Sequence, residues 1–97
     1  MVYTFVMFFE FDSKKQSANL IKHGIDLRDA ASIFSYVNRL DSLDTRNDYA
    51  EERRITIGVV QNRIWVVVYT QRADAIRLLA ARKSNEREQK RYHALYD

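Results

Sequence analysis

Changes in the spacing of hydrophobic and polar residues divide the chain into predicted strands and helices. Residues 5–11, FVMFFEF, are mostly aromatic or β-branched and apolar on both faces, which predicts a largely covered strand. Asp12 ends this strand. Ser13, with Gln16 three residues later, has the pattern of a capping box, so a helix is predicted to begin there.

This first helix is predicted to end at Lys22 or His23, because Gly24 follows. Glycine adopts the left-handed conformation of a helix end without a steric penalty. Asp26 is then a predicted N-cap of a second helix. The apolar stripe of that helix has the spacing i, i+3, i+4, i+7 and consists of Leu27, Ala30, Ala31 and Phe34.

The second half of the chain has the pattern of strands. The polar stretch from Ser35 to Ala50 predicts at most a short strand at residues 36–40. Alternating residues 53–60, a tight turn, and the continuous apolar run 64–70 predict a hairpin. Residues 75–82 have the length of a strand and follow at turn distance, so a further strand is predicted there.

A C-terminal helix is predicted over residues 85–96, with Ser84 or Asn85 as its N-cap. Its residues divide into a basic face and an aromatic face. The basic face carries Arg87, Lys90 and Arg91, and the face predicted to dock on the sheet carries Tyr92, Leu95 and Tyr96.

This order of elements predicts an α+β fold in which two N-terminal helices pack on an antiparallel sheet of about four strands. The C-terminal helix completes it. The chain has 97 residues, 46% of them hydrophobic, which suits a single domain over residues 1–97. No apolar run approaches the roughly 20 residues of a membrane span.

The distribution of charge along the chain bears on which binding partners the protein could have. The formal charge is +3, and residues 1–71 balance nine Lys and Arg against nine Asp and Glu. The excess therefore belongs to residues 72–97. A solvated face is the usual explanation for such a segment, and an acidic protein or RNA partner is the alternative.

Several kinds of chemistry are disfavoured by composition. The chain has no cysteine, two histidines far apart, and neither a nucleophile elbow nor a phosphate-binding glycine loop. No metal site or cofactor is therefore predicted. The spacing of Asp41, Asp44 and Asp48 does not fit a calcium loop, and a solvated turn is the expected structure.

Arginines at the ends of the predicted strands form the remaining constellation. Each of them is costly on an apolar sheet unless it meets a carboxylate or an anionic ligand. Pairing of Arg53 or Arg77 with Glu51, Glu52 or Asp74 is one interpretation, and a phosphate cradle is the other. His23 is the candidate proton carrier beside them, although it could simply stabilise a helix end.

Three stretches read together resemble the BrnT family of type II toxins. They are FEFDSKKQSANLIKHGIDLRDAASIF, EERRITIG and VVVYTQRADAIRLLAARKSNEREQKRY. The family pattern runs F-E-W-D, K-H-G, G-E-x-R before I-G, Y-T-x-R, I-R-I-I-S-A-R and E-R-x-x-Y. This sequence departs from the pattern at three positions. Phe11 stands where the family has tryptophan, Ala50 where it has glycine and Ala80 where it has serine.

The resemblance implies a RelE-like fold and a metal-independent, growth-arresting endoribonuclease in the cytoplasm. It implies a cognate BrnA-type ribbon-helix-helix antitoxin, and contact with operator DNA only through that antitoxin. A non-catalytic co-repressor that binds the antitoxin, or a degenerate member, is the alternative. The family's E-R-x-x-Y falls on Glu86 or Glu88 with Tyr92. The candidate catalytic residues are Lys22, His23, Glu51, Arg53, Arg72, Arg77 and Arg82, and the candidate RNA-binding residues are Lys83, Arg87, Arg91 and Tyr92.

Overall fold

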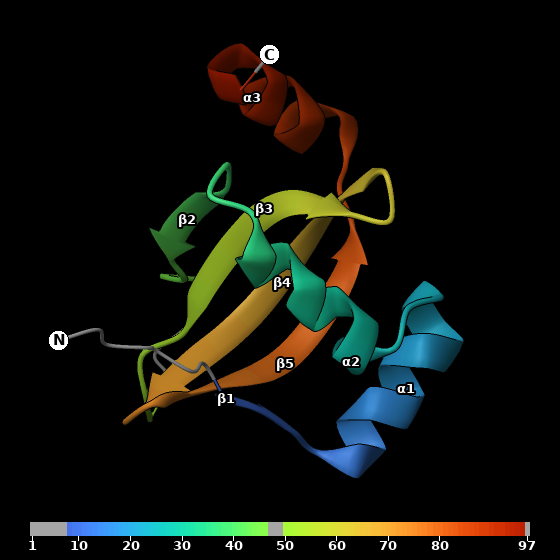
Figure 1. The fold of residues 1–97 in the computed structure, drawn as a ribbon, viewed down its shortest axis with the longest axis vertical. Helices are drawn as coiled ribbons and strands as arrows, with labels where there is room; N and C mark the ends of the chain where they lie inside the picture. The colour runs from blue at the N-terminus through green and yellow to red at the C-terminus, as the bar shows by residue number, and fades with distance from the viewer. Residues whose placement is uncertain (1–7, 47–49, 97) are drawn as a thin grey trace, which may run out of the picture.

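The computed structural model describes residues 8–46 and 50–96 as an α+β fold with one mixed sheet (Figure 1). The sheet has five strands in the order β1-β5-β4-β3-β2. The elements are β1 (Phe8–Phe11), α1 (Ser13–His23), α2 (Leu27–Ala30), the 3₁₀ helix η1 (Ala31–Ser35), β2 (Leu40–Leu43), β3 (Arg54–Val60), β4 (Arg63–Arg72), β5 (Ala75–Lys83) and α3 (Glu86–Tyr96).

The α+β class is confirmed, but the prediction of an antiparallel sheet of about four strands is wrong. β1 pairs with β5 in parallel, and the other neighbouring strands are antiparallel. The parallel pairing joins Phe8 to Ala75. Because these partners are so far apart in sequence, no local pattern reports which strand β1 joins.

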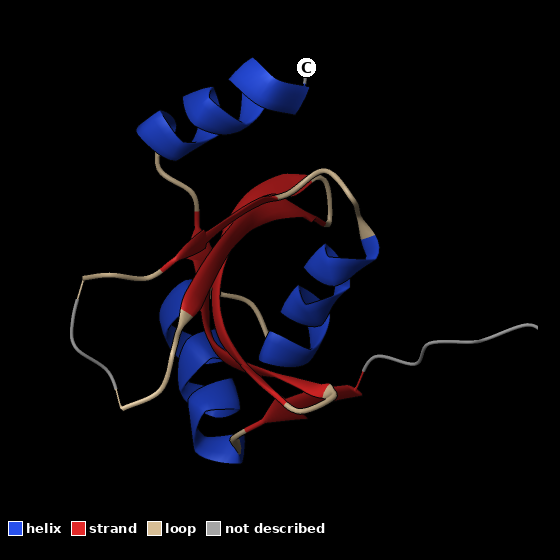
Figure 2. Cartoon of the chain, turned by 90° about the vertical axis from the view of Figure 1, so that its left-hand side faces the viewer, coloured by secondary structure: helices blue, strands red, loops and turns tan. Residues whose placement is uncertain are grey.

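Helices cover the two faces of the curved sheet unequally. α2 and η1 pack on one face, whereas α3 lies at one end of the other face (Figure 2). The main core lies under α2 and η1. Its buried residues are Ile25, Leu27, Ala30, Ala31, Ile33, Val60, Trp65, Val67, Tyr69, Ile76, Leu78 and Ala81.

The first helix begins one residue away from the predicted N-cap. Asp12 is the N-cap, and its side chain accepts hydrogen bonds from the backbone N–H groups of Lys14 and Lys15. Gln16 instead donates to the carboxylate of Asp26, at 2.7 Å, which links α1 to the next helix. The helix end is as predicted, because Gly24 has φ 77° and its N–H donates to the Leu20 carbonyl.

Two strand predictions need correction. The described part of the first strand is the edge strand β1, where Phe8 is exposed, so the strand is not largely covered; residues 5–7 lie outside the described residues. Tyr36 to Arg39 form a loop, and the short strand is β2, shifted to Leu40–Leu43. Within the described residues, no helix is long and apolar enough to cross a membrane.

Asn85, not Ser84, is the N-cap of α3. Its side chain accepts from the Glu88 N–H and its own N–H donates to the Glu88 carboxylate, each at 2.8 Å. Tyr92 and Tyr96 dock on the sheet as predicted, and their hydroxyls donate to carbonyls of the loop before β2. Leu95 is exposed, so its predicted docking is wrong.

Candidate functional site

A β-bulge places two of the candidate arginines on the same side of the sheet. Across the β4–β5 pair, Arg77 lies opposite Thr70 and Arg82 lies opposite Val66. The register shifts between them, so the fifth residue after Arg77 faces the same way as Arg77 instead of the opposite way. We call this side, opposite α2, the arginine face; it carries Arg72, Arg77 and Arg82.

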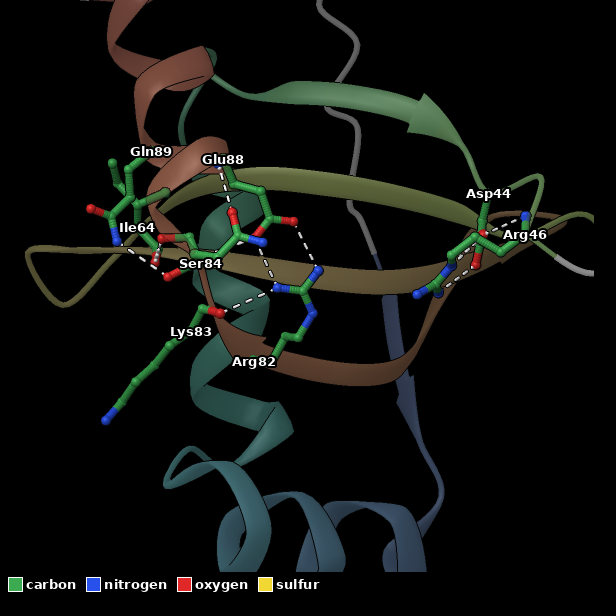
Figure 3. A network of polar contacts seen from close by, with 9 residues as sticks. Asp44, Arg46, Ile64, Arg82, Lys83, Ser84, Glu88 and Gln89 are labelled. Atoms are coloured by element: carbon green, nitrogen blue, oxygen red, sulfur yellow. Dashed lines mark hydrogen bonds and ion pairs between the residues drawn. The ribbon is translucent and has the colours of Figure 1, made fainter.

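Each of these three arginines forms an ion pair with a carboxylate. Arg72 binds Glu51 through two nitrogens at 3.1 and 3.2 Å, and Arg77 binds Glu10 at 3.1 Å. Arg82 binds both carboxylate oxygens of Glu88, at 2.8 and 2.9 Å (Figure 3). Arg77 thus meets a carboxylate as one interpretation of the sequence held, but its partner is Glu10 and not Glu51, Glu52 or Asp74. No partner had been predicted for Arg72 or Arg82.

His23 meets Arg82 at the end of β5. The last turn of α1 and the last residues of β5 line an open pocket of about 430 Å³. Its walls are Lys22, His23, Gly24, Arg82 and Lys83. Four candidate residues from two distant parts of the sequence thus converge on one small hollow, and three of them carry a positive charge.

Asn19 is the residue that holds the end of α1 against β5. β1 pairs with β5 only as far as Leu78, so the next part of β5 lacks a strand neighbour on that side. The buried Asn19 side chain takes the place of a neighbour by accepting from the Ala81 N–H at 3.0 Å. It also donates to the Ile25 carbonyl at 2.9 Å, which fixes the chain just after His23.

The surroundings of His23 favour its neutral imidazole. Partial burial and the positive charges of Lys22 and Arg82 lower its pKa below the ordinary value of 6.5. At neutral pH the side chain is therefore mostly unprotonated and able to accept a proton.

Replacing Lys22 by Gln is expected to raise the pKa of His23, because it removes one of the charges that oppose protonation. The wild-type fold favours neutral His23, so this contribution to stability is complete above pH 6.5 and is lost as pH falls through the folded pKa. NMR titration of the imidazole signals of wild type and K22Q measures the shift. His93 lies on α3 and serves as the internal reference, and an unchanged His23 titration in K22Q would contradict this electrostatic account.

A second group of candidate residues lies where β4 turns into β5. The pKa of Glu51 is lowered chiefly by its hydrogen bond to Arg72, with smaller effects from the charges of Arg53 and Arg77. Glu51 is therefore ionised and a weak base. Arg53 precedes β3, and its carbonyl accepts from the Asp44 N–H at 2.8 Å.

The predicted catalytic residues thus fall into two groups. Lys22, His23 and Arg82 lie at one end of β5, and Arg72 and Arg77 with Glu51 and Arg53 lie at the other. Arg77 and Arg82 are separated by roughly 16 Å of strand. Arg72 lies farther still from Arg82, because it is opposite Ala75 at the start of β5. A phosphate bound between His23 and Arg82 is therefore not also held by Arg72.

The candidate RNA-binding residues of α3 also divide. Arg87 and Arg91 are exposed on its outer surface. Tyr92 is buried against Ile57 and Val66. This placement makes Tyr92 an anchor of the helix and leaves little of its ring for stacking on a base.

Asp41 and Asp44 each bind arginine side chains, so the prediction of a solvated turn is wrong for these two residues. Asp41 pairs with Arg39 and Arg54 and accepts from the Tyr69 hydroxyl. The side chain of Asp44 has no exposed surface and binds Arg46. Asp48 lies outside the described residues. Among residues 8–46 and 50–96, no three His, Asp or Glu side chains are grouped as metal ligands would be.

Sequence reasoning missed Glu10, Asn19 and Arg46 as parts of this region. Glu10 and Asn19 bind partners that are distant in the sequence, whereas Arg46 binds Asp44 only two residues away, a spacing that a local search could have noticed. Glu88 was one of two candidates for the motif glutamate. Glu88, and not Glu86, is the carboxylate that binds Arg82.

The fold and this cluster define an α+β protein with an arginine-rich sheet face and a histidine at its end. A family model described as "Ribonuclease toxin, BrnT, of type II toxin-antitoxin system" matches residues 11–88. The chain belongs to this BrnT family and is thus a ribonuclease toxin of the type II toxin–antitoxin class. No curated protein matches the chain at a significant level.

Proposed function

We propose that the protein is a metal-independent endoribonuclease that cuts RNA in the pocket between His23 and Arg82. The observation that carries the proposal is the convergence of Lys22, His23, Arg82 and Lys83 on this pocket. Cleavage without a metal requires a proton acceptor, a proton donor and cations for the negatively charged transition state. The pocket contains each of these groups.

In this mechanism neutral His23 takes the proton from a ribose 2′-hydroxyl, whose oxygen then attacks the adjacent phosphorus. The bond from phosphorus to the 5′-oxygen breaks, and that oxygen receives a proton from Lys22, one of the two lysines that line the pocket. Arg82 stabilises the negative charge on the phosphoryl oxygens. The products are a 2′,3′-cyclic phosphate and a 5′-hydroxyl.

Glu88 prepares Arg82 for this role. Its carboxylate binds Nη1 and Nη2 of Arg82 and is itself held by the Asn85 N–H. The guanidinium group is therefore oriented before RNA binds, which reduces the entropy lost on binding. In the same way Glu51 orients Arg72 and Glu10 orients Arg77. We assign these two arginines, with Arg53, to RNA flanking the cleaved bond.

The partner in this proposal is a BrnA-type ribbon-helix-helix antitoxin in the cytoplasm, through which the toxin reaches operator DNA. The outer surface of α3 supports an acidic contact, since Arg87, Lys90 and Arg91 are all exposed there. Lys83 lines the pocket and lies on the segment that leads into α3. RNA and an acidic antitoxin segment would then compete for overlapping cations.

Incubation of the purified toxin with RNA in excess EDTA tests the proposal directly. We expect cleavage without a partner, with 2′,3′-cyclic phosphate ends detected by mass spectrometry. An RNA with a 2′-deoxyribose at the cut position should stay intact, because it lacks the attacking oxygen. Cleavage that stops in EDTA, or that proceeds at the deoxyribose, would contradict the mechanism.

A non-catalytic co-repressor is the second candidate function. The observation in its favour is that Arg72, Arg77 and Arg82 already have carboxylate partners, which suits a purely structural role. Such a protein would leave RNA intact in the EDTA assay and still bind its antitoxin.

A further inference from the structure

Arg46 lies in the segment that follows β2, on the side of the sheet that carries Arg82 (Figure 3). Its side chain is 60% exposed, whereas the side chain of its partner Asp44 is 0% exposed. Both oxygens of Asp44 accept from Arg46, Nε and Nη2 each donating at 2.8 Å. The Arg46 backbone N–H donates to the same carboxylate at 3.2 Å.

A buried carboxylate is costly unless its hydrogen bonds are satisfied. Here the buried charge holds one exposed guanidinium in a planar, two-point arrangement that a lysine could not reproduce. A surface arginine without such support would lose side-chain entropy on binding a ligand. The arrangement thus presents Arg46 in a fixed orientation towards the arginine face.

Arg46 and Arg82 are close enough to influence each other. Hydrogen bonds to Glu88 are the main cause of the raised pKa of Arg82, and the charge of Arg46 acts in the opposite direction. Two guanidinium groups that are each held by a carboxylate and face one region of the surface repel one another. An anion between or beside them relieves that repulsion.

We infer that Arg46 is a phosphate-binding residue of the arginine face and holds an RNA backbone phosphate next to the one bound by Arg82. Asp44 is its positioning residue. The inference rests on the proposed function, because RNA is the ligand. It adds a contact on the β2–β3 loop that extends the RNA path from the pocket across the sheet.

Binding of an RNA oligonucleotide with methylated 2′-hydroxyls tests the inference, because this RNA cannot be cut through its 2′-oxygen. Fluorescence anisotropy over a range of salt concentrations gives the affinity and its salt dependence. For Arg46→Gln we expect about a tenfold weaker Kd near 0.1 M salt and a salt slope reduced by roughly 0.7, the value for one lost phosphate contact on a single strand. Arg46→Lys should keep the slope and lose part of the affinity.

Arg28→Gln is the matched control, since Arg28 is an exposed arginine on α2, on the other side of the sheet. Its affinity should stay within about twofold of wild type. Asp44→Asn should keep the salt slope, because the charge of Arg46 remains, and should lower the affinity less than Arg46→Gln does, because only the fixed orientation is lost; the Arg46 variants carry the test if it fails to fold. Equal RNA affinity of Arg46→Gln and Arg28→Gln would overturn the inference about Arg46. The proposed function would still stand in that case if the wild-type protein cleaves RNA. Failure of wild type to bind and cut RNA would remove both.

Discussion

His23→Ala is expected to lower the rate of RNA cleavage by about 100-fold or more and to abolish growth arrest in cells. A positioned proton carrier contributes roughly 10²- to 10⁴-fold to a rate, and His23 is the only histidine in the pocket with Arg82. Single-turnover cleavage of a defined RNA measures the chemical step without the contribution of product release. The fall should appear in the rate at saturating enzyme more than in RNA affinity.

His93→Ala provides the matched control, because His93 is exposed and lines a different hollow beside α3. It should cleave RNA as wild type does. Thermal unfolding of both variants shows whether the fold is intact. Normal cleavage by His23→Ala, with reduced cleavage by His93→Ala, would move the active site to α3.

Asn19→Ala is expected to lower the free energy of unfolding by roughly 2–4 kcal/mol. It leaves two buried backbone groups, the Ala81 N–H and the Ile25 carbonyl, without the side chain that binds them. Each such loss costs about 1–3 kcal/mol. The total is a large fraction of the 5–15 kcal/mol typical of a domain, so urea unfolding should show a clearly lower midpoint.

Asn19→Ala should also impair cleavage, since Asn19 ties the end of α1 that carries His23 to β5. Ser17→Ala, at an exposed position of the same helix, should change stability by less than about 0.5 kcal/mol. Asn19→Asp keeps the acceptor for the Ala81 N–H but places a buried carboxylate oxygen against the Ile25 carbonyl, so it should be at least as destabilising as Asn19→Ala. Equal stability of Asn19→Ala and Ser17→Ala would show that these hydrogen bonds contribute little.

The β3–β4 hairpin was the most predictable part of the sheet. The hairpin between β3 and β4 was predicted from the run of apolar residues, and its turn residues Gln61 and Asn62 both have the positive φ that suits it. The helix end at Gly24 was also predictable, because a glycine that directly follows a helical pattern suits the positive φ of a helix end. Each of these features depends on residues close together in sequence, so a local pattern contains the information.

The site was predictable only in part. The resemblance to the BrnT family selected Lys22, His23 and Arg82, and the structure places them in one pocket. Glu10 escaped notice because its partner Arg77 belongs to a strand at the other end of the chain. Asp44 was misjudged, because a charged residue in a polar stretch is usually exposed.

The sequence by itself determined the order of the strands and helices, the basic C-terminal segment and the family. Those features depend on local spacing, composition and ordered motifs. The tertiary structure alone decided that β1 joins β5 in parallel and that Asn19 completes the edge beyond it. It also decided that a bulge turns Arg77 and Arg82 to the same face. The physical reason is that strand register and the pairing of distant charges are set by contacts between segments, which no spacing within one segment records.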